Sequence, residues 1–265
     1  ILTLGGTILG TSRYKPHKWP KKGGGSEDRT DDAVKSYKSL GLDALVCLGG
    51  GGTQKNAFRL MERGGLDIVT LPKTIDNDIA GTDRSFGFDT AMGIACEAID
   101  RLHTTASSHH RCMLIDLMGH NAGWLALGAG LAGGADVILI PEIPFSFRKV
   151  AYALAKRERR HKRFSIVAVA EGAVAVEEGG GGAEEDEDAP HAEDVLRPTL
   201  SHRLAAHIQE ENGLETRVTT LGHLQRGGTP TPTDRSLATL LGAKAGACVL
   251  QGRFGDMVRL LAGVG

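Results

Sequence analysis

Asp43-Ala44-Leu45-Val46-Cys47-Leu48-Gly49-Gly50-Gly51-Gly52-Thr53 is the stretch that decides the fold. Residues 43–48 form a short, mostly apolar run, which is typical of a buried parallel strand. Four consecutive glycines follow, and a helical pattern then continues to about Arg63. A strand that passes through a glycine turn into a helix is the basic unit of an α/β fold, so this stretch predicts a parallel sheet covered by helices.

The same alternation of strand and helix extends over most of the chain. Apolar spacing predicts an amphipathic helix from Phe88 to about Leu102, and residues 1–7 are interpreted as a strand that runs into a glycine turn. The remaining strands are expected at 67–71 (ending at Pro72), 113–117, 137–140, 166–170 and 216–221, and the remaining helices at 31–41, 199–211 and from 234. Strands that alternate with helices in this way favour a parallel α/β sheet.

Composition narrows the function classes. The 265 residues (28.0 kDa) are enough for one large domain or two modest ones. With 31 Lys and Arg against 32 Asp and Glu, the net charge of −1 does not point to nucleic acid or to a membrane surface. The four cysteines are scattered without a CxxC pair, which argues against disulfides or a zinc site and favours a cytoplasmic location. Glycine is the outlier, with 37 residues gathered in clusters.

Two motifs follow predicted strands near the middle of the sequence. Gly49-Gly50-Gly51-Gly52-Thr53 is interpreted as a loop that binds phosphate through its N–H groups, with a simple flexible turn as the alternative. Pro72-Lys73-Thr74-Ile75-Asp76-Asn77-Asp78 brings two carboxylates and a hydroxyl together, a set suited to phosphoryl transfer. A plain polar turn is the alternative interpretation of the second motif.

Cationic residues mark the later motifs. Leu221-Gly222-His223-Leu224-Gln225-Arg226-Gly227-Gly228, with Arg217 six residues before His223, has the side chains to receive a phosphate monoester. Met118-Gly119-His120-Asn121-Ala122-Gly123-Trp124 is another strand-to-helix turn, and Arg111 precedes its strand. Each of these features alone is equally compatible with surface charge or a packed turn.

Taken together and in order, these motifs resemble the 6-phosphofructokinase family over roughly residues 5 to 245. The resemblance rests on GGTILGTSR, GGGGT, PKTIDNDI, the FGFDTA run, MGHNAGWLAL, ADVILIPE and LGHLQRGGTP. It implies two parallel-sheet α/β domains flanking an active-site cleft, and transfer of a phosphoryl group to the 1-hydroxyl of fructose 6-phosphate. It further implies Mg²⁺, ATP or pyrophosphate as the donor, and a homo-oligomer, either a tetramer or a dimer.

The resemblance also assigns roles to individual residues. It makes Asp76 the general base, with Thr74 beside it, Asp78 supporting the metal-bound phosphates and Arg13 reaching the transferring group. It places the sugar phosphate against a second group of residues, of which the equivalents of Arg111 and Arg217 come from a neighbouring subunit in the family. The complete substrate-binding set is Thr74, Asp76, Arg111, Met118, Gly119, His120, Glu171, Arg217, His223 and Arg226.

The donor site implied by the resemblance departs from the family pattern. It consists of Arg13, Gly50, Gly51, Gly52, Thr53 and Lys73. Gly51 stands where the family has an Asp that helps to hold Mg²⁺, so no metal ligand is assigned in this chain. Gly52 is typical of ATP users, whereas Lys73 is typical of pyrophosphate users, and the balance favours ATP. His120 stands where the family often has Arg.

The resemblance gives a domain plan and an alternative function. Residues 1–117 are expected to bind the donor, with 233–265 possibly returning to them, and residues 118–232 to bind the sugar phosphate. An acidic, solvated insertion is expected at 177–194. The family's N-terminal strand and its first Gly-Gly-Asp loop are missing from the sequence, which suggests truncation. A catalytically weakened sugar-phosphate binder or fragment therefore remains the alternative to an active enzyme.

Overall fold

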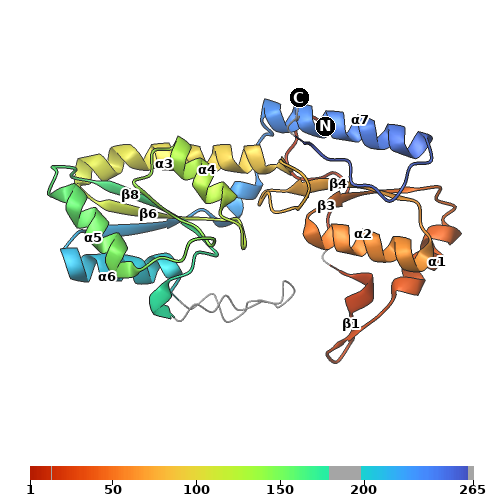
Figure 1. Ribbon diagram of the computed structural model, residues 1–265, viewed down its shortest axis with the longest axis horizontal. Helices are drawn as coiled ribbons and strands as arrows, with labels where there is room; N and C mark the ends of the chain where they lie inside the picture. Colours follow the sequence, from red (N-terminus) through yellow and green to blue (C-terminus); the bar gives the residue numbers. More distant parts are fainter. Residues whose placement is uncertain (13, 179–197, 262–265) are drawn as a thin grey trace. The chain divides into compact units, whose positions relative to one another are not determined.

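A computed structural model describes residues 1–12, 14–178 and 198–261. Its helices and strands alternate as the sequence predicts (Figure 1). In chain order they are η1 (Pro16–Lys18), β1 (Trp19–Pro20), β2 (Ser26–Glu27), α1 (Thr30–Ser39), β3 (Leu45–Gly49), α2 (Gly51–Gly64), β4 (Ile68–Thr74), β5 (Phe86–Gly87), α3 (Phe88–His109), β6 (Cys112–Leu117), α4 (Trp124–Ala132), β7 (Val137–Leu139), α5 (Phe147–Glu158), β8 (Ser165–Ala170), η2 (Val176–Glu178), α6 (Leu200–Asn212), β9 (Thr216–Thr220), η4 (Gly222–Arg226) and α7 (Pro232–Leu250).

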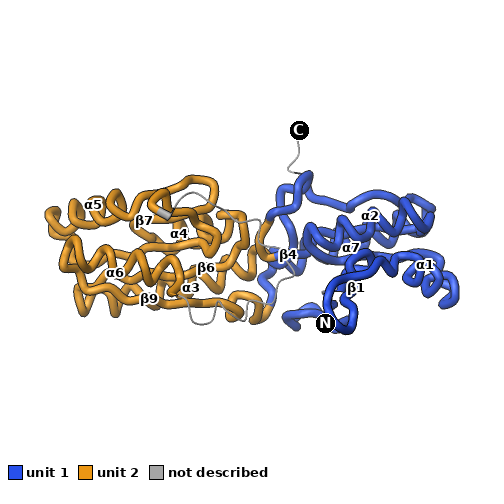
Figure 2. Tube along the Cα trace, turned by 90° about the horizontal axis from the view of Figure 1, so that it is seen from below, with its two compact units in different colours: residues 1–74, 78–87, 230–265 blue, residues 75–77, 88–229 orange. Residues whose placement is uncertain are grey.

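The chain divides into two compact units, shown in blue and orange in Figure 2. Unit 1 comprises residues 1–74, 78–87 and 230–265, and unit 2 comprises residues 75–77 and 88–229. The boundary therefore lies at residue 88, whereas we expected it at 118. Residues 88–117 belong to unit 2 because β6 is an inner strand of its sheet and α3 packs on that strand.

Unit 1 is a three-layer α/β structure. Its sheet has the order β3-β4-β5 with parallel pairing, and α7 packs on β4 and β5 while α2 packs on β3. Apolar residues cover both faces of β4: Val69 and Leu71 meet Leu237 and Leu241 of α7, and Ile68 contributes to the cluster on the α1 and α2 side. The alternation of Ile68, Val69 and Leu71 between the faces follows from the two-residue period of a strand.

Unit 2 has the same layer plan with four parallel strands in the order β7-β8-β6-β9. Helices α3 and α4 cover one face, and α5 and α6 cover the other (Figure 1). Every residue of β8 is buried, which explains why its sequence is a continuous run of small and apolar side chains. The predicted α/β class with parallel sheets is confirmed.

Three sequence predictions are wrong in detail. The strand expected to be buried at residues 43–48 forms as β3, but its Val46 and Leu48 are exposed, so it is covered on one face only. Residues 1–7 form turns with exposed side chains instead of a strand, and no strand pairs with them in the described part of the chain. The strand predicted to end at Pro72 continues to Thr74, because Lys73 and Thr74 pair with β5 beyond the proline. The expected insertion at 177–194 begins in η2, and its residues 179–194 lie outside the described residues.

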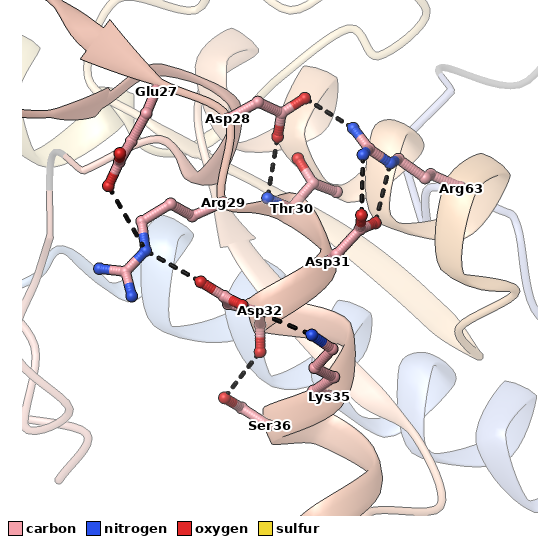
Figure 3. Close-up of polar contacts among 9 residues, drawn as sticks. All are labelled: Glu27, Asp28, Arg29, Thr30, Asp31, Asp32, Lys35, Ser36 and Arg63. Atoms are coloured by element: carbon pink, nitrogen blue, oxygen red, sulfur yellow. Dashed lines mark hydrogen bonds and ion pairs between the residues drawn. The ribbon is translucent and has the colours of Figure 1, made fainter.

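Charged side chains join α1 to the end of α2 (Figure 3). Asp28 accepts a hydrogen bond from the N–H of Thr30 at 2.9 Å, and Arg63 reaches both Asp28 (2.6 Å) and Asp31 (2.9 Å). The hydrogen bonds from Thr30 and then the guanidinium of Arg63 lower the pKa of Asp28 to about 2. These exposed pairs orient α1 but, being solvated, contribute little to stability.

No helix in the described part of the chain is long and apolar enough to cross a membrane.

Candidate functional site

The carboxyl ends of β3 and β4 bring the first two motifs together in unit 1. The strands pair in parallel with Gly49 opposite Pro72, so the glycine loop (residues 49–53) and the segment that begins at Lys73 leave the sheet side by side. The Nε2 of Gln54 joins the two strand ends, donating to the carbonyls of Gly49 (3.4 Å) and Leu71 (3.3 Å). Ligands of open α/β sheets bind at this edge.

The glycine loop is open where a phosphate would approach. Gly49 is required by packing, because a Cβ there would collide with the side chain of Thr53. A Cβ on Gly51 or Gly52 would meet nothing within 4 Å. No described residue accepts a hydrogen bond from the N–H groups of residues 51–53, which form the first turn of α2. Free N–H groups at a helix N-terminus attract anions.

The second motif lies where the chain passes from one unit to the other. Thr74 ends β4 in unit 1, residues 75–77 belong to unit 2, and Asp78 belongs to unit 1 again. Lys73 and Asp78 are exposed, and Asp76 is partly buried. Asn77 has a positive φ of 53°, a conformation that Asn adopts more readily than most residues. The segment therefore makes a sharp turn between the two Asp residues.

The carboxyl edge of the unit 2 sheet gathers most of the predicted sugar-phosphate residues. Residues 118–120 follow β6, Glu171 follows β8, and His223 and Arg226 lie in η4 after β9. Since β8, β6 and β9 are neighbours in the sheet, these groups leave it at adjacent strand ends. His223, Arg226 and Glu171 are exposed, so an imidazole, a guanidinium and a carboxylate are available to a ligand.

Side chains occupy the backbone N–H groups of the loop between β6 and α4. Glu171 Oε1 accepts from Gly119 (3.1 Å) and His120 (2.7 Å), and Gln225 Oε1 accepts from Met118 (2.9 Å). At the end of the loop, Glu142 Oε1 accepts from Gly123 at 2.8 Å. These N–H groups are therefore already bonded within the protein, so a phosphate here would depend on side chains.

This hydrogen bonding holds a backbone that is unfavourable on its own. Gly119 has a φ of 144°, and His120 has a φ of 50°, a left-handed conformation in a residue with a Cβ. Sequence reasoning singled out Met118, Gly119 and Glu171 but missed Gln225 and Glu142. The available signal was a polar residue inside each quoted motif, between His223 and Arg226 in one and three residues after the strand in the other.

The remaining two predicted cations lie at the opposite edge of the same sheet. Arg111 precedes β6, and Arg217 lies near the start of β9, opposite Met113. Both guanidinium groups bind the same oxygen of Glu215, with 2.9 Å between Arg111 Nη2 and that oxygen. The ion pair with Arg111, and secondarily the charge of Arg217, lowers the pKa of Glu215.

The length of β6 separates these two cationic groups. Six residues at about 3.3 Å each span roughly 20 Å, so Arg111 cannot reach a phosphate held by His223 and Arg226 in the same copy. Arg13, which the resemblance places at the transferring group, lies outside the described residues.

The described residues do not form a metal site by themselves. No group of three or more His, Cys, Asp or Glu side chains in the described ranges is placed to hold a metal ion. Mg²⁺ usually takes one or two protein carboxylates and completes its coordination with substrate phosphates and water. The acidic residues present therefore fit a magnesium ion that arrives with the phosphates of a substrate.

Comparisons with known proteins agree with this arrangement. The chain is 51% identical to the ATP-dependent 6-phosphofructokinase of Propionibacterium freudenreichii over 97% of its length and 73% of the relative's. It is 52% identical to the enzyme of the same name from Spirochaeta thermophila, over 98% of this chain and 71% of that one. It is also 46% identical to a pyrophosphate–fructose 6-phosphate 1-phosphotransferase of Streptomyces coelicolor, over 98% and 73%.

Among solved structures, phosphofructokinase from Saccharomyces cerevisiae superposes with a TM-score of 0.76 at 34% identity. The match covers 94% of this chain but only 34% of the much longer yeast chain. The family model described as phosphofructokinase matches residues 1–249. The chain therefore belongs to the phosphofructokinase family.

Proposed function

We propose that the protein transfers a phosphoryl group to the 1-hydroxyl of fructose 6-phosphate, forming fructose 1,6-bisphosphate in glycolysis. The observation that carries this proposal is identity of about 50% to ATP-dependent 6-phosphofructokinases over nearly the whole chain. The arrangement of side chains supports it, because one sheet edge offers free N–H groups to phosphates and another offers exposed cations to a sugar phosphate.

In this reaction Asp76 is the general base. Its carboxylate takes the proton of the 1-hydroxyl as the hydroxyl oxygen attacks the terminal phosphorus of the donor, and the bond from that phosphorus to the bridging oxygen breaks. Thr74 lies beside the acceptor hydroxyl, Asp78 supports the magnesium-bound phosphates, and Arg13 contacts the transferring group. Asp76 lies two residues after the end of β4, at the strand edge where parallel sheets place reactive side chains.

The donor binds to unit 1 and the sugar phosphate to unit 2. Residues 50–53 and Lys73 receive the donor phosphates, and the exposed His223 and Arg226 bind the 6-phosphate. Glu171 has one carboxylate oxygen occupied by two N–H groups, and its second oxygen accepts from a sugar hydroxyl. Residues 118–120 shape the floor of the sugar site.

ATP is the donor favoured by the named relatives and by Gly52, where a carboxylate would repel phosphate. Pyrophosphate is the alternative donor, and Lys73 and the pyrophosphate-using relative favour it. Single-turnover assays with ATP and pyrophosphate in parallel decide between them. Faster transfer from pyrophosphate at saturating donor would reject ATP. Magnesium, on which the family generally depends, enters as part of the donor substrate.

We further propose that the sugar site is completed by Arg111 and Arg217 of a second copy, since neither can reach it within one chain. The test mixes two weakened variants, Arg217→Ala and Arg226→Ala. If sites are shared, a mixed oligomer contains one site with both arginines intact, and activity rises well above that of either variant alone. Activity equal to the mean of the two variants would show that each site is built by a single chain.

A catalytically weakened binder of sugar phosphate is the second candidate. Gly51, in place of the family's magnesium-supporting Asp, is the observation that favours it. Binding of fructose 6-phosphate in calorimetry without turnover from either donor would support this alternative. Location in the cytoplasm stays a prediction, consistent with four free cysteines.

A further inference from the structure

Gln225 lies at the centre of the proposed sugar site but cannot touch the sugar. It is 1% exposed, whereas its neighbours His223 and Arg226 in the same short helix are exposed. The 3₁₀ geometry of η4 explains this contrast, because a turn of three residues cannot direct adjacent side chains to the same face. A fully buried amide among cationic neighbours requires an explanation, since burying an amide costs free energy unless it is bonded.

Its single hydrogen bond in the described structure crosses to another element. Gln225 Oε1 accepts from the N–H of Met118 at 2.9 Å, and its Nε2 is buried with no partner in the described residues. Met118 is the first residue after β6 ends, so its N–H has left the sheet ladder and needs another acceptor. The bond therefore fixes η4 to the start of the Met118–Gly123 loop.

The loop begins at this bond and then adopts its unfavourable conformation. Gly119 and His120, both with positive φ, follow Met118 directly, and their N–H groups bind Glu171. A displacement of Met118 would therefore be passed to His120 and to the Glu171 carboxylate. On the other side, the Gln225 backbone lies between His223 and Arg226, so one side chain sets the spacing between the two halves of the site.

We propose that Gln225 is a positioning residue for the sugar phosphate, acting through its hydrogen bond to Met118. This inference rests on the proposed function. Gln225 holds the exposed cations of η4 and the loop at residues 118–120 in register, without contact with substrate or with the reacting atoms. Because unit 2 alone contains this contact, the effect falls on the sugar phosphate and leaves the donor site unchanged.

The decisive variant is Gln225→Met, which keeps the side-chain length and removes the hydrogen bond. Leaving the Met118 N–H buried without an acceptor is expected to raise KM and Kd for fructose 6-phosphate by about 10-fold. We expect kcat to change less than about 3-fold and KM for ATP to stay constant. Gln209→Met, an exposed position on α6, serves as the matched control.

The possible results separate the inference from the proposed function. If the wild-type protein does not bind fructose 6-phosphate in calorimetry, the proposed function fails. If the wild type binds and Gln225→Met binds equally well, the positioning role is overturned. An equal loss in kcat and in both KM values would indicate general damage and also overturn it. Should Gln225→Met not fold, Gln225→Asn withdraws the amide by one methylene and is judged by the same comparison of KM values.

Discussion

Two strand-to-helix junctions in this molecule look alike in sequence and differ in what they do with their backbone. The glycine loop after β3 leaves the N–H groups of residues 51–53 without an acceptor from the described residues. In the Met118–Gly123 loop after β6, the N–H groups of Met118, Gly119, His120 and Gly123 bind three side chains from other elements. Glycine-rich turns thus serve opposite purposes. The first is open to a phosphate, and the second is a rigid support for side chains.

The variant with the largest expected effect tests whether the two junctions contribute to ligand binding only and not to the chemical step. If they do, removal of the proposed general base should stop chemistry and spare affinity. Asp76→Asn is expected to lower kcat by about 10²- to 10⁴-fold while Kd for fructose 6-phosphate changes little, because an amide cannot accept the hydroxyl proton. Rapid-quench kinetics and calorimetry measure the two quantities. Asp100→Asn, on the exposed side of α3, is the control. Wild-type turnover in Asp76→Asn would remove Asp76 from the mechanism.

The next effect tests whether the second junction relies on side chains. Arg226→Ala should weaken fructose 6-phosphate binding by about 10- to 100-fold, because the occupied N–H groups of the loop cannot compensate for the lost cation. Isothermal titration calorimetry at two salt concentrations measures this loss. Arg101→Ala, an exposed residue of α3, should leave affinity unchanged. An unaltered Kd for Arg226→Ala would show that the loop binds phosphate by other means.

A smaller effect sharpens the account of the open junction. Gly51→Asp places a carboxylate where the structure leaves at least 4 Å of space, and Gly51 does not have a positive φ. We expect the variant to fold normally and to raise kcat several-fold at limiting Mg²⁺, because the carboxylate would help to hold a magnesium ion that accompanies the donor phosphates. Gly51→Ala has the same backbone change without the charge. Equal magnesium titrations for the two variants would contradict this role.

The smallest expected effect concerns the stability of α2, the helix whose first turn forms the open junction. Asp28 bonds Thr30 and Arg63, and Arg63 lies in the last turn of α2, whose first turn forms the glycine loop. The folded pKa of Asp28, about 2, lies below its ordinary value of 3.8, so its contribution to stability is present above pH 4 and is lost as pH falls through about 2.

Asp28→Asn should therefore lower Tm slightly at pH 7 and have a clearly smaller effect near pH 2. Thermal melts across this range, with Asp43→Asn as an exposed control, measure the difference. A constant difference in Tm at every pH would show that charge is not the cause.

Much of this fold follows from the sequence because strands such as β8 are buried on both faces and must be continuously apolar. The glycine loop was equally visible, because it directly follows the apolar run of residues 43–48, although Val46 and Leu48 of β3 are exposed. Residues 1–7 were predicted to be a strand because Ile1, Leu2 and Leu4 are apolar. A strand also needs a neighbouring strand to pair with, and a single sequence does not show which strands become neighbours. The end of β4 was predicted wrongly at Pro72, because a proline ends a strand only where its missing N–H would have to donate a hydrogen bond to a neighbouring strand.

For the candidate site, the sequence identified individual residues but not their contacts. Family motifs named His223, Arg226 and Glu171, but their partners depend on which strands become neighbours. Gln225 and Met118 are 107 positions apart, and the order β8-β6-β9 alone brings them together. The separation of Arg111 and Arg217 from His223 likewise follows from strand direction and length, quantities that motif spacing does not contain.

The return of α7 to unit 1 has a consequence for synthesis on the ribosome. Unit 2 is almost continuous in sequence, so its core can close once β9 has emerged. The apolar cluster of unit 1 joins Val69 and Leu71 to Leu237 and Leu241, partners separated by more than 160 positions. One face of β4 therefore stays exposed until α7 has been synthesised. Unit 2 is able to fold before that point. The nascent chain should need protection by chaperones mainly at β4, over the interval in which residues 88–229 are made.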